Sequence, residues 1–264
     1  MQHRLWLFFL GLFLALSPCR AEVVPEPVLA DILRQAGMEG SIVLTETGSQ
    51  TLRVSDEVAS GKRYLPASTF KVVNALIALE NGLVQEEERF PWDGAPLPFK
   101  TWEKELSLQE AMAVSSVPVF QGIARRIGLQ RMQEWVGKLD YGNGEIGTVV
   151  DRFWLDGPLV LSAQEAARFM ARVAEGQLPF SPATFAAVRR ILPKEEIGEA
   201  RLFGKTGWAM SAKPMIGWYV GWVENRDKKV AFAVNIRMKS PEEAPLRKSL
   251  ALEALRRLGM VETK

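Results

Sequence analysis

Histidine and cysteine are almost absent from this chain of 264 residues, which holds one of each, His3 and Cys19. Both fall in residues 1–21, a segment with the parts of a secretory signal peptide. Arg4 precedes an apolar run, and Ala21 supplies a small residue for cleavage. Cleavage there would leave a mature chain without a disulfide, a Cys or His metal site, a cysteine nucleophile or a histidine base. Serine chemistry in it would have to use lysine or a carboxylate instead.

A long hydrophobic run is also missing. The apolar stretch of the predicted signal peptide is too short to span a bilayer comfortably. A retained N-terminal anchor and lipidation of Cys19 stay open as alternatives to cleavage, although Pro18 before Cys19 fits a lipid-attachment site poorly. We therefore expect a secreted, periplasmic protein without stable membrane association, whose residues 22–264 form one domain.

Charge of one sign is not in excess either. The chain has 33 Lys and Arg against 31 Asp and Glu, a formal net charge of +2. Arg4 and Arg20 would leave with the signal peptide, so no basic face for nucleic acid is indicated. Hydrophobic residues make up 47% of the chain, which is enough to bury a full core as one large domain or two lobes.

The most informative stretch that is present is Ser68-Thr69-Phe70-Lys71, the only Ser-x-x-Lys of the chain. It opens a run over 70–79 that is apolar on nearly every face and therefore predicts a buried helix. Residues three apart share a helix face, so the Ser68 hydroxyl and the Lys71 amine can meet. Because burial lowers a lysine pKa, this amine could accept the hydroxyl proton. Alternatively, Ser68 only caps the helix and Lys71 extends to the surface.

The order of elements predicts an α+β fold, with an antiparallel sheet built from both chain ends, flanking helices and a mostly helical lobe. We assign residues about 22–65 and 195–264 to a mixed lobe and about 66–194 to the helical lobe. Small ligands would bind between the lobes, beside the helix that follows Ser68. The predicted strands are 41–46, 51–54, 201–206, 215–224 and 229–237, and the predicted helices include 22–36, 117–127, 129–139 and 246–258, with helix starts at Ser107, Ser162 and Ser181.

Three further motifs and one tryptophan are weak indicators of function when each is taken alone. Lys205-Thr206-Gly207 could hold a substrate carboxylate at the end of a strand, but taken alone it is better explained by a turn with an exposed lysine. Ser115-Ser116-Val117 could be a plain helix cap, and Tyr141-Gly142-Asn143 has the composition of a turn. Trp154 lies in an apolar patch and could simply belong to the core.

Taken together, these pieces resemble the serine penicillin-recognising enzymes, and in detail the class D (oxacillinase-type) β-lactamases. The motifs cover about residues 65–250 and are jointly specific. The class A pattern fits less well, because Ser115-Ser116-Val117 stands where that class has Ser-Asp-Asn. The resemblance rests on Ser68-Thr69-Phe70-Lys71, Ser115-Ser116-Val117, Tyr141-Gly142-Asn143, Phe153-Trp154-Leu155, Lys205-Thr206-Gly207-Trp208 and Pro245-Leu246-Arg247-Lys248-Ser249.

The resemblance implies four catalytic residues. Ser68 would attack the lactam carbonyl and become acylated. Lys71 would carry a carboxyl group taken from carbon dioxide (N6-carboxylysine) and act as general base for acylation and deacylation. Ser115 and Lys205 would relay protons near the leaving nitrogen. No metal and no separate cofactor is implied.

The resemblance also implies how the modified lysine and the substrate are held. Phe70, Val117 and Trp154 would form the pocket of the carbamate, because apolar surroundings favour an unprotonated amine. The backbone N–H groups of two residues would form the oxyanion hole. These are Ser68 and Trp208, and the substrate carboxylate would be bound by Thr206, Gly207 and Arg247.

The implied function is hydrolysis of β-lactam antibiotics, penicillins first, with oxacillin-like penicillins, cephalosporins and carbapenems left open. The partner is then a small molecule, and the protein is a monomer or a homodimer. Two alternatives use the same serine and lysine. One is a penicillin-binding protein that deacylates slowly, and the other is a β-lactam sensor domain that binds covalently without turnover.

Overall fold

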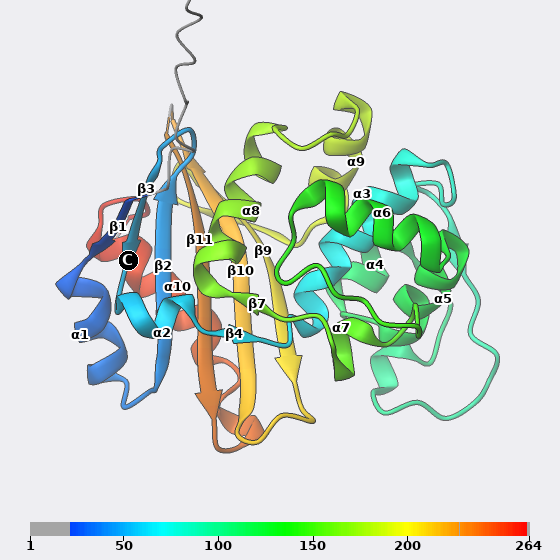
Figure 1. The fold of residues 1–264 in the computed structure, drawn as a ribbon, viewed down its shortest axis with the longest axis horizontal. Coiled ribbons are helices and arrows are strands. Elements are labelled where there is room, and N and C mark those ends of the chain that lie inside the picture. Colours follow the sequence, from blue (N-terminus) through cyan, green and yellow to red (C-terminus); the bar gives the residue numbers. More distant parts are fainter. Residues whose placement is uncertain (1–21, 227, 263–264) are drawn as a thin grey trace, which may run out of the picture.

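The computed structural model of the protein describes residues 22–226 and 228–262, and a seven-stranded sheet runs through it (Figure 1). Its strands are β1 (Glu22–Pro25), β2 (Gly40–Glu46), β3 (Thr51–Val54), β8 (Lys194–Ile197), β9 (Ala200–Ala209), β10 (Met215–Asn225) and β11 (Lys228–Met238).

The strands lie in the order β1-β3-β2-β11-β10-β9-β8. Neighbours are antiparallel, except that β1 runs parallel to β3. Strands from the start of the chain thus form one side of the sheet and strands from its end form the other, joined where β2 pairs with β11. The α+β fold expected from the sequence is confirmed.

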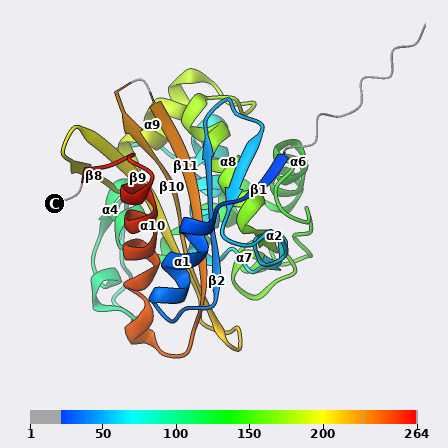
Figure 2. The same ribbon diagram turned by 90° about the vertical axis from the view of Figure 1, so that its left-hand side faces the viewer.

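Helices cover both faces of this sheet. The helices α1 and α10 lie side by side on one face (Figure 2), and α8 packs against β2 and β11 on the other. The remaining larger helices lie beyond α8 and surround α3 (Figure 1). The helices are α1 (Pro27–Gln35), α2 (Glu57–Gly61), α3 (Lys71–Glu80), α4 (Leu108–Ala113), α5 (Val117–Ile127), α6 (Leu129–Leu139), α7 (Phe153–Asp156), α8 (Ala163–Glu175), α9 (Pro182–Ile191) and α10 (Leu246–Arg257), with single 3₁₀ turns η1 (Ala67–Phe70), η2 (Lys100–Trp102) and η3 (Pro241–Glu243) and short strands β4 (Arg63–Tyr64), β5 (Arg89–Phe90), β6 (Leu106–Ser107) and β7 (Leu161–Ser162).

The sheet separates two hydrophobic cores. Side chains alternate between the two faces of a strand, so on β10 Trp218 and Trp222 pack with α3 and its neighbours, while Tyr219 and Val223 pack with α1 and α10. The first core contains nearly all of α3, which is buried from Lys71 to Ala78. The buried helix predicted after Ser68 is therefore found, and it begins as the 3₁₀ turn η1.

The leading segment differs from its prediction. Residues 22–36 were expected to form one helix, but 22–25 pair with β3 as strand β1, and α1 begins at Pro27. Proline suits the first turn of a helix, because it lacks only an N–H that would have no partner there. The periodicity of Leu29, Ile32 and Leu33 belongs to α1 alone, and the expectation was wrong over its first four residues.

The helix boundaries of the middle region agree well with the sequence. Ser107 and Ser162 both form capping boxes, and Ser181 accepts a hydrogen bond from Thr184 N–H at the start of α9. Helix α5 ends before Gly128, as expected. The predicted signal peptide lies outside the described residues. Among the residues that are described, no helix is long and apolar enough to cross a membrane.

Candidate active site

Ser68 lies on the 3₁₀ turn that leads into α3. The residue before it, Ala67, has φ +49°, a left-handed conformation that is uncommon for a residue with a side chain. This bend brings Ser68 to the surface of a cleft while the following residues enter the core. The Lys71 Nζ donates a hydrogen bond of 2.6 Å to the Ser68 Oγ. The structure thus brings together the two groups that a spacing of three predicted.

Lys71 lies wholly within the protein, with 0% of its surface exposed. Its Nζ sits 5.6 Å from the centre of the Phe120 ring, and no carboxylate in the described part of the chain forms an ion pair with it. Burial lowers the pKa of Lys71 well below its usual value, and the charge of Lys205 lowers it further. Both effects favour the unprotonated amine. The burial of Lys71 excludes the alternative in which it extends to the surface.

A cluster of aromatic rings surrounds Phe70, the residue before Lys71. Phe70 stacks on Trp154 at 5.6 Å and meets Tyr141 and Phe153 edge-on. Trp154 is fully buried, and its Nε1–H has no hydrogen-bond partner among the described residues. A buried donor without a partner costs free energy, so such a group indicates a bound ligand or a functional role.

Asn74 is a buried polar residue that the sequence analysis did not single out. It lies three residues after Lys71 on α3 and so shares that face of the helix. Its side-chain oxygen and nitrogen both lack partners within the described part of the chain. An asparagine inside an otherwise apolar run was the signal that could have identified it.

The second lysine meets the second serine across a long sequence separation. The Lys205 Nζ, on β9, donates to the Ser115 Oγ at 2.9 Å and to the Thr206 carbonyl at 2.8 Å. Ser115 also has a left-handed backbone, with φ +58°. Burial lowers the pKa of Lys205 to about 7, and the charge of Arg247 contributes.

The edge of β9 is open along the part of the strand that faces Ser68. Strand β8 pairs with β9 only as far as Phe203, after which Gly204 N–H bonds to the Pro193 carbonyl. Backbone N–H groups of a strand alternate in direction, so those of Thr206 and Trp208 point to this same edge. The geometry leaves the Trp208 N–H available to a ligand beside Ser68.

Gly207 explains how close β9 comes to the nucleophile turn. A Cβ at this position would lie 2.9 Å from the Thr69 Cγ2 and 3.0 Å from the Pro66 carbonyl. Only glycine fits there without a shift of the backbone. Arg247, from the start of α10, donates to the Gly207 carbonyl at 2.7 Å and lies over the Trp208 ring.

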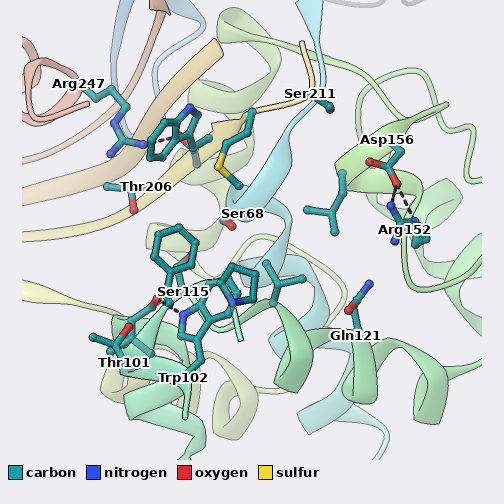
Figure 3. A pocket seen from close by; sticks show the side chains of 18 residues that line it. Ser68, Thr101, Trp102, Ser115, Gln121, Arg152, Asp156, Thr206, Ser211 and Arg247 are labelled. Carbon is teal, nitrogen blue, oxygen red and sulfur yellow. Dashed lines mark hydrogen bonds and ion pairs between the residues drawn. The ribbon is translucent and has the colours of Figure 1, made fainter. Parts of the chain in front are cut away.

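A cleft of about 450 Å³ joins these parts (Figure 3). Ser68 lies in its middle, with Thr206 and Arg247 on one side and Ser115 below. The two buried lysines lie beneath its surface and do not line it. Of the residues predicted for the site, the cleft is lined by Ser68, Ser115, Val117, Thr206, Gly207, Trp208 and Arg247, while Phe70, Lys71, Trp154 and Lys205 lie behind them.

Comparison with known proteins decides the family. The model of the penicillin binding protein transpeptidase domain matches residues 41–256. Beta-lactamase OXA-10 of Pseudomonas aeruginosa is 37% identical over 228 residues, which are 85% of this chain and 86% of that protein. Beta-lactamase OXA-48 of Klebsiella pneumoniae is 37% identical over 219 residues, or 83% of each chain. This chain belongs to the class D β-lactamases.

Solved structures agree with this assignment. The class D β-lactamase FUS-1 (OXA-85) from Fusobacterium nucleatum subsp. polymorphum superposes with a TM-score of 0.87 at 34% identity, covering 90% of this chain and all of that one. The class D β-lactamase YbXI from Nostoc gives a TM-score of 0.85 at 35% identity, over 88% of this chain and 99% of that one. The family resemblance and the enzyme class expected from the sequence are confirmed.

In this class D β-lactamase the Tyr141-Gly142-Asn143 motif joins two segments of the chain. The Asn143 side chain donates to the Pro158 carbonyl at 3.0 Å and accepts from Val160 N–H at 3.0 Å. A Cβ on Gly142 would lie 2.2 Å from the Val160 carbonyl, so the segments touch backbone to backbone. The motif supports the turn that carries Trp154, in line with the architectural role expected for it.

Several residues that line the cleft of this β-lactamase were not singled out from the sequence. Phe99 and Trp102 come from the segment between α3 and α4, which contains Pro91, Pro96 and Pro98, and Met210 follows β9. Gln121, Arg152 and Asp156 line the side away from Arg247 (Figure 3). Aromatic residues in a proline-rich segment are a usable signal, but nothing in the sequence alone places isolated polar residues in a cleft. Among residues 22–226 and 228–262, no group of three or more His, Cys, Asp and Glu is placed to hold a metal ion.

Proposed function

We propose that this enzyme hydrolyses β-lactam antibiotics, penicillins first, through an acyl-serine intermediate, with carboxylated Lys71 as general base. The observation that carries the proposal is a fully buried lysine of lowered pKa hydrogen-bonded to Ser68. It occurs in a chain whose relatives are named β-lactamases.

Acylation joins Ser68 to the substrate. The Ser68 Oγ attacks the lactam carbonyl carbon, the ring C–N bond breaks, and the hydroxyl proton finally reaches the ring nitrogen. We assign the delivery of that proton to Lys205 and Ser115. The Lys205 Nζ donates a hydrogen bond to the Ser115 Oγ, and the pKa of Lys205 is about 7, which suits proton transfer near neutral pH. In deacylation a water molecule attacks the ester carbonyl, and the Ser68 Oγ leaves with a proton.

The surroundings of Lys71 fit a carboxylated lysine. Only an unprotonated amine can attack the carbon of carbon dioxide, forming an N–C bond and releasing one proton, and burial favours that form. Trp154 and Asn74 each carry a buried side-chain N–H that has no hydrogen-bond partner among the described residues. Asn74 lies about one helical turn after Lys71, and Trp154 stacks on Phe70, the residue before Lys71. The modification would supply a carboxylate oxygen as the base, which is the role proposed for Lys71 in both half-reactions.

Binding of the substrate follows from the open edge of β9. The backbone N–H groups of Ser68 and Trp208 would hold the carbonyl oxygen as negative charge develops on it. Thr206 and Arg247 would bind the substrate carboxylate at the Arg247 side of the cleft, with Gly207 allowing close approach to the backbone. We further propose export by the predicted signal peptide to the periplasm, as a monomer or homodimer.

Mass spectrometry of the enzyme mixed with excess benzylpenicillin, while ring opening is followed, tests this function. An adduct on Ser68 that disappears as many equivalents of drug are opened supports a β-lactamase. An adduct that persists after about one equivalent supports the penicillin-binding protein or sensor alternatives, the first of which the transpeptidase-domain match also allows. Ser68→Ala should form no adduct. Lack of both an adduct and ring opening with the unaltered enzyme would contradict all three readings.

A further inference from the structure

The cleft is charged at both of its sides. Among the residues that the structure describes, charged side chains line it at Arg247, Arg152 and Asp156. Arg247 lies on one side of Ser68, with Thr206, and the other two lie on the opposite side (Figure 3). The rest of the lining consists of apolar and uncharged polar side chains.

Arg152 and Asp156 form an ion pair on the single turn of α7. The Arg152 Nε donates to the Asp156 Oδ2 at 2.7 Å, and its Nη2 also contacts that oxygen. The side chains are 58% and 41% exposed, so both are open to a ligand in the cleft. A guanidinium has five N–H donors, and those on Nη1 are not used by Asp156.

The orientation of a penicillin follows from the proposed function, on which this inference rests. Its carboxylate and its acylamino group lie at opposite ends of the bicyclic nucleus. With the carboxylate at Arg247 and the lactam carbonyl at Ser68, the acylamino group extends away from Arg247. It then points to the side of the cleft where Gln121, Arg152 and Asp156 lie.

We propose that Arg152 determines selectivity for penicillins that carry an anionic group on the side-chain carbon next to the amide carbonyl. A carboxylate or sulfonate at this position would be held by the free N–H donors of the guanidinium, since arginine binds planar oxyanions in a fork. Asp156 orients Arg152 and opposes the anion by like charge. The same carboxylate would favour an ammonium group at that carbon.

Three penicillins that differ only at this carbon make the test direct. Benzylpenicillin carries hydrogen there, ampicillin an amino group and carbenicillin a carboxylate. The quantity to measure is kcat/KM for each drug divided by kcat/KM for benzylpenicillin, in the same bicarbonate-containing buffer. Normalising to benzylpenicillin removes any general loss of activity or folding from the comparison.

Arg152→Gln should lower the carbenicillin ratio about fivefold, the size expected for one exposed ion pair. Arg152→Glu should lower it further and raise the ampicillin ratio. Asp156→Asn should raise the carbenicillin ratio and lower the ampicillin ratio. Arg125→Gln is the matched control, because Arg125 pairs with Asp151 at 2.5 Å nearby but neither residue lines the cleft. Its two ratios should equal those of the unaltered enzyme.

Two outcomes would count against the inference, and they are distinguishable. If Arg152→Gln and Arg152→Glu keep the carbenicillin ratio while benzylpenicillin is still hydrolysed, the role of Arg152 is overturned and the proposed function stands. If the unaltered enzyme does not open benzylpenicillin, the proposed function is overturned, and the inference falls with it.

Discussion

The two buried lysines of the site are alike in setting but differ in chemistry. Lys71 and Lys205 are 0% and 1% exposed, and each donates a hydrogen bond to a serine hydroxyl. Lys71 begins a helix and faces the Phe120 ring, and its Nζ donates a hydrogen bond to the Ser68 hydroxyl. Lys205 lies on a strand and also donates to a backbone carbonyl, that of Thr206.

Burial shifts both pKa values downward. The pKa of Lys205 is lowered to about 7 by burial and by the charge of Arg247, and that of Lys71 is lowered well below its usual value by burial. A group with a pKa near 7 can give and take a proton at neutral pH, whereas a neutral amine suits reaction with carbon dioxide. The charge of Lys205 also lowers the pKa of Lys71, so one lysine helps to keep the other neutral.

The largest expected effect is on turnover when Lys71 is removed. Lys71→Ala should reduce kcat for benzylpenicillin about 10⁴-fold, near the upper limit for loss of a general base. Circular dichroism should show an unchanged fold, since the alanine leaves α3 intact. Lys62→Ala, at an exposed position, serves as the control. Turnover at the unaltered rate in Lys71→Ala would refute the assignment of the base.

The lowered pKa of Lys205 should make the free energy of unfolding depend on pH. This pKa is about 7 in the folded protein and 10.5 when unperturbed, so the unfolded chain binds more protons between these values. Stability contributed by this group therefore rises with pH across that window. Between pH 7.5 and 9.5 the free energy of unfolding should rise about 2 kcal/mol more in the unaltered enzyme than in Lys205→Met. Denaturant titrations at both pH values measure this, and equal rises in the two proteins would contradict the low pKa.

The smallest expected effect concerns the indole of Trp154. Trp154→Phe keeps an aromatic wall beside Phe70 but removes the unpartnered Nε1–H. If this N–H steadies a carboxyl group on Lys71, the variant should need about tenfold more bicarbonate for half-maximal activity, the worth of one hydrogen bond to a charged group. Trp135→Phe, whose ring stacks on Phe180 instead, is the control. An unchanged bicarbonate requirement in Trp154→Phe would exclude this contribution.

Local spacing predicted one half of the site but not the other. Ser68 and Lys71 are three residues apart on a helical segment, so their contact followed from helix geometry. Ser115 and Lys205 are separated by 90 positions, and no periodicity relates them. Only the resemblance to a family predicted that they belong to one site, because tertiary packing and not local geometry sets their distance.

The fold was predictable to a similar degree. Strands with β-branched and aromatic residues and helices with capping boxes were identified from sequence, since those signals are local. Strand β1 was missed because its pairing partner, β3, begins 29 positions later than it does and supplies the hydrogen bonds. The cleft side chains of Trp102 and Arg152 were missed for the same reason, as loop conformation decides where they point.

The pairing of β2 with β11 has a consequence for how the protein forms. The centre of the sheet joins residues 40–46 to residues 230–236, so its contacts are highly non-local. The chain must close a loop of that length before these contacts can form, and the closure costs conformational entropy. We therefore expect folding to be correspondingly slow. Because β9 and α10 also follow late in the chain, Ser68 meets Trp208 and Arg247 only after synthesis is almost complete. A nascent chain of this enzyme therefore lacks the complete cleft until its last strands dock.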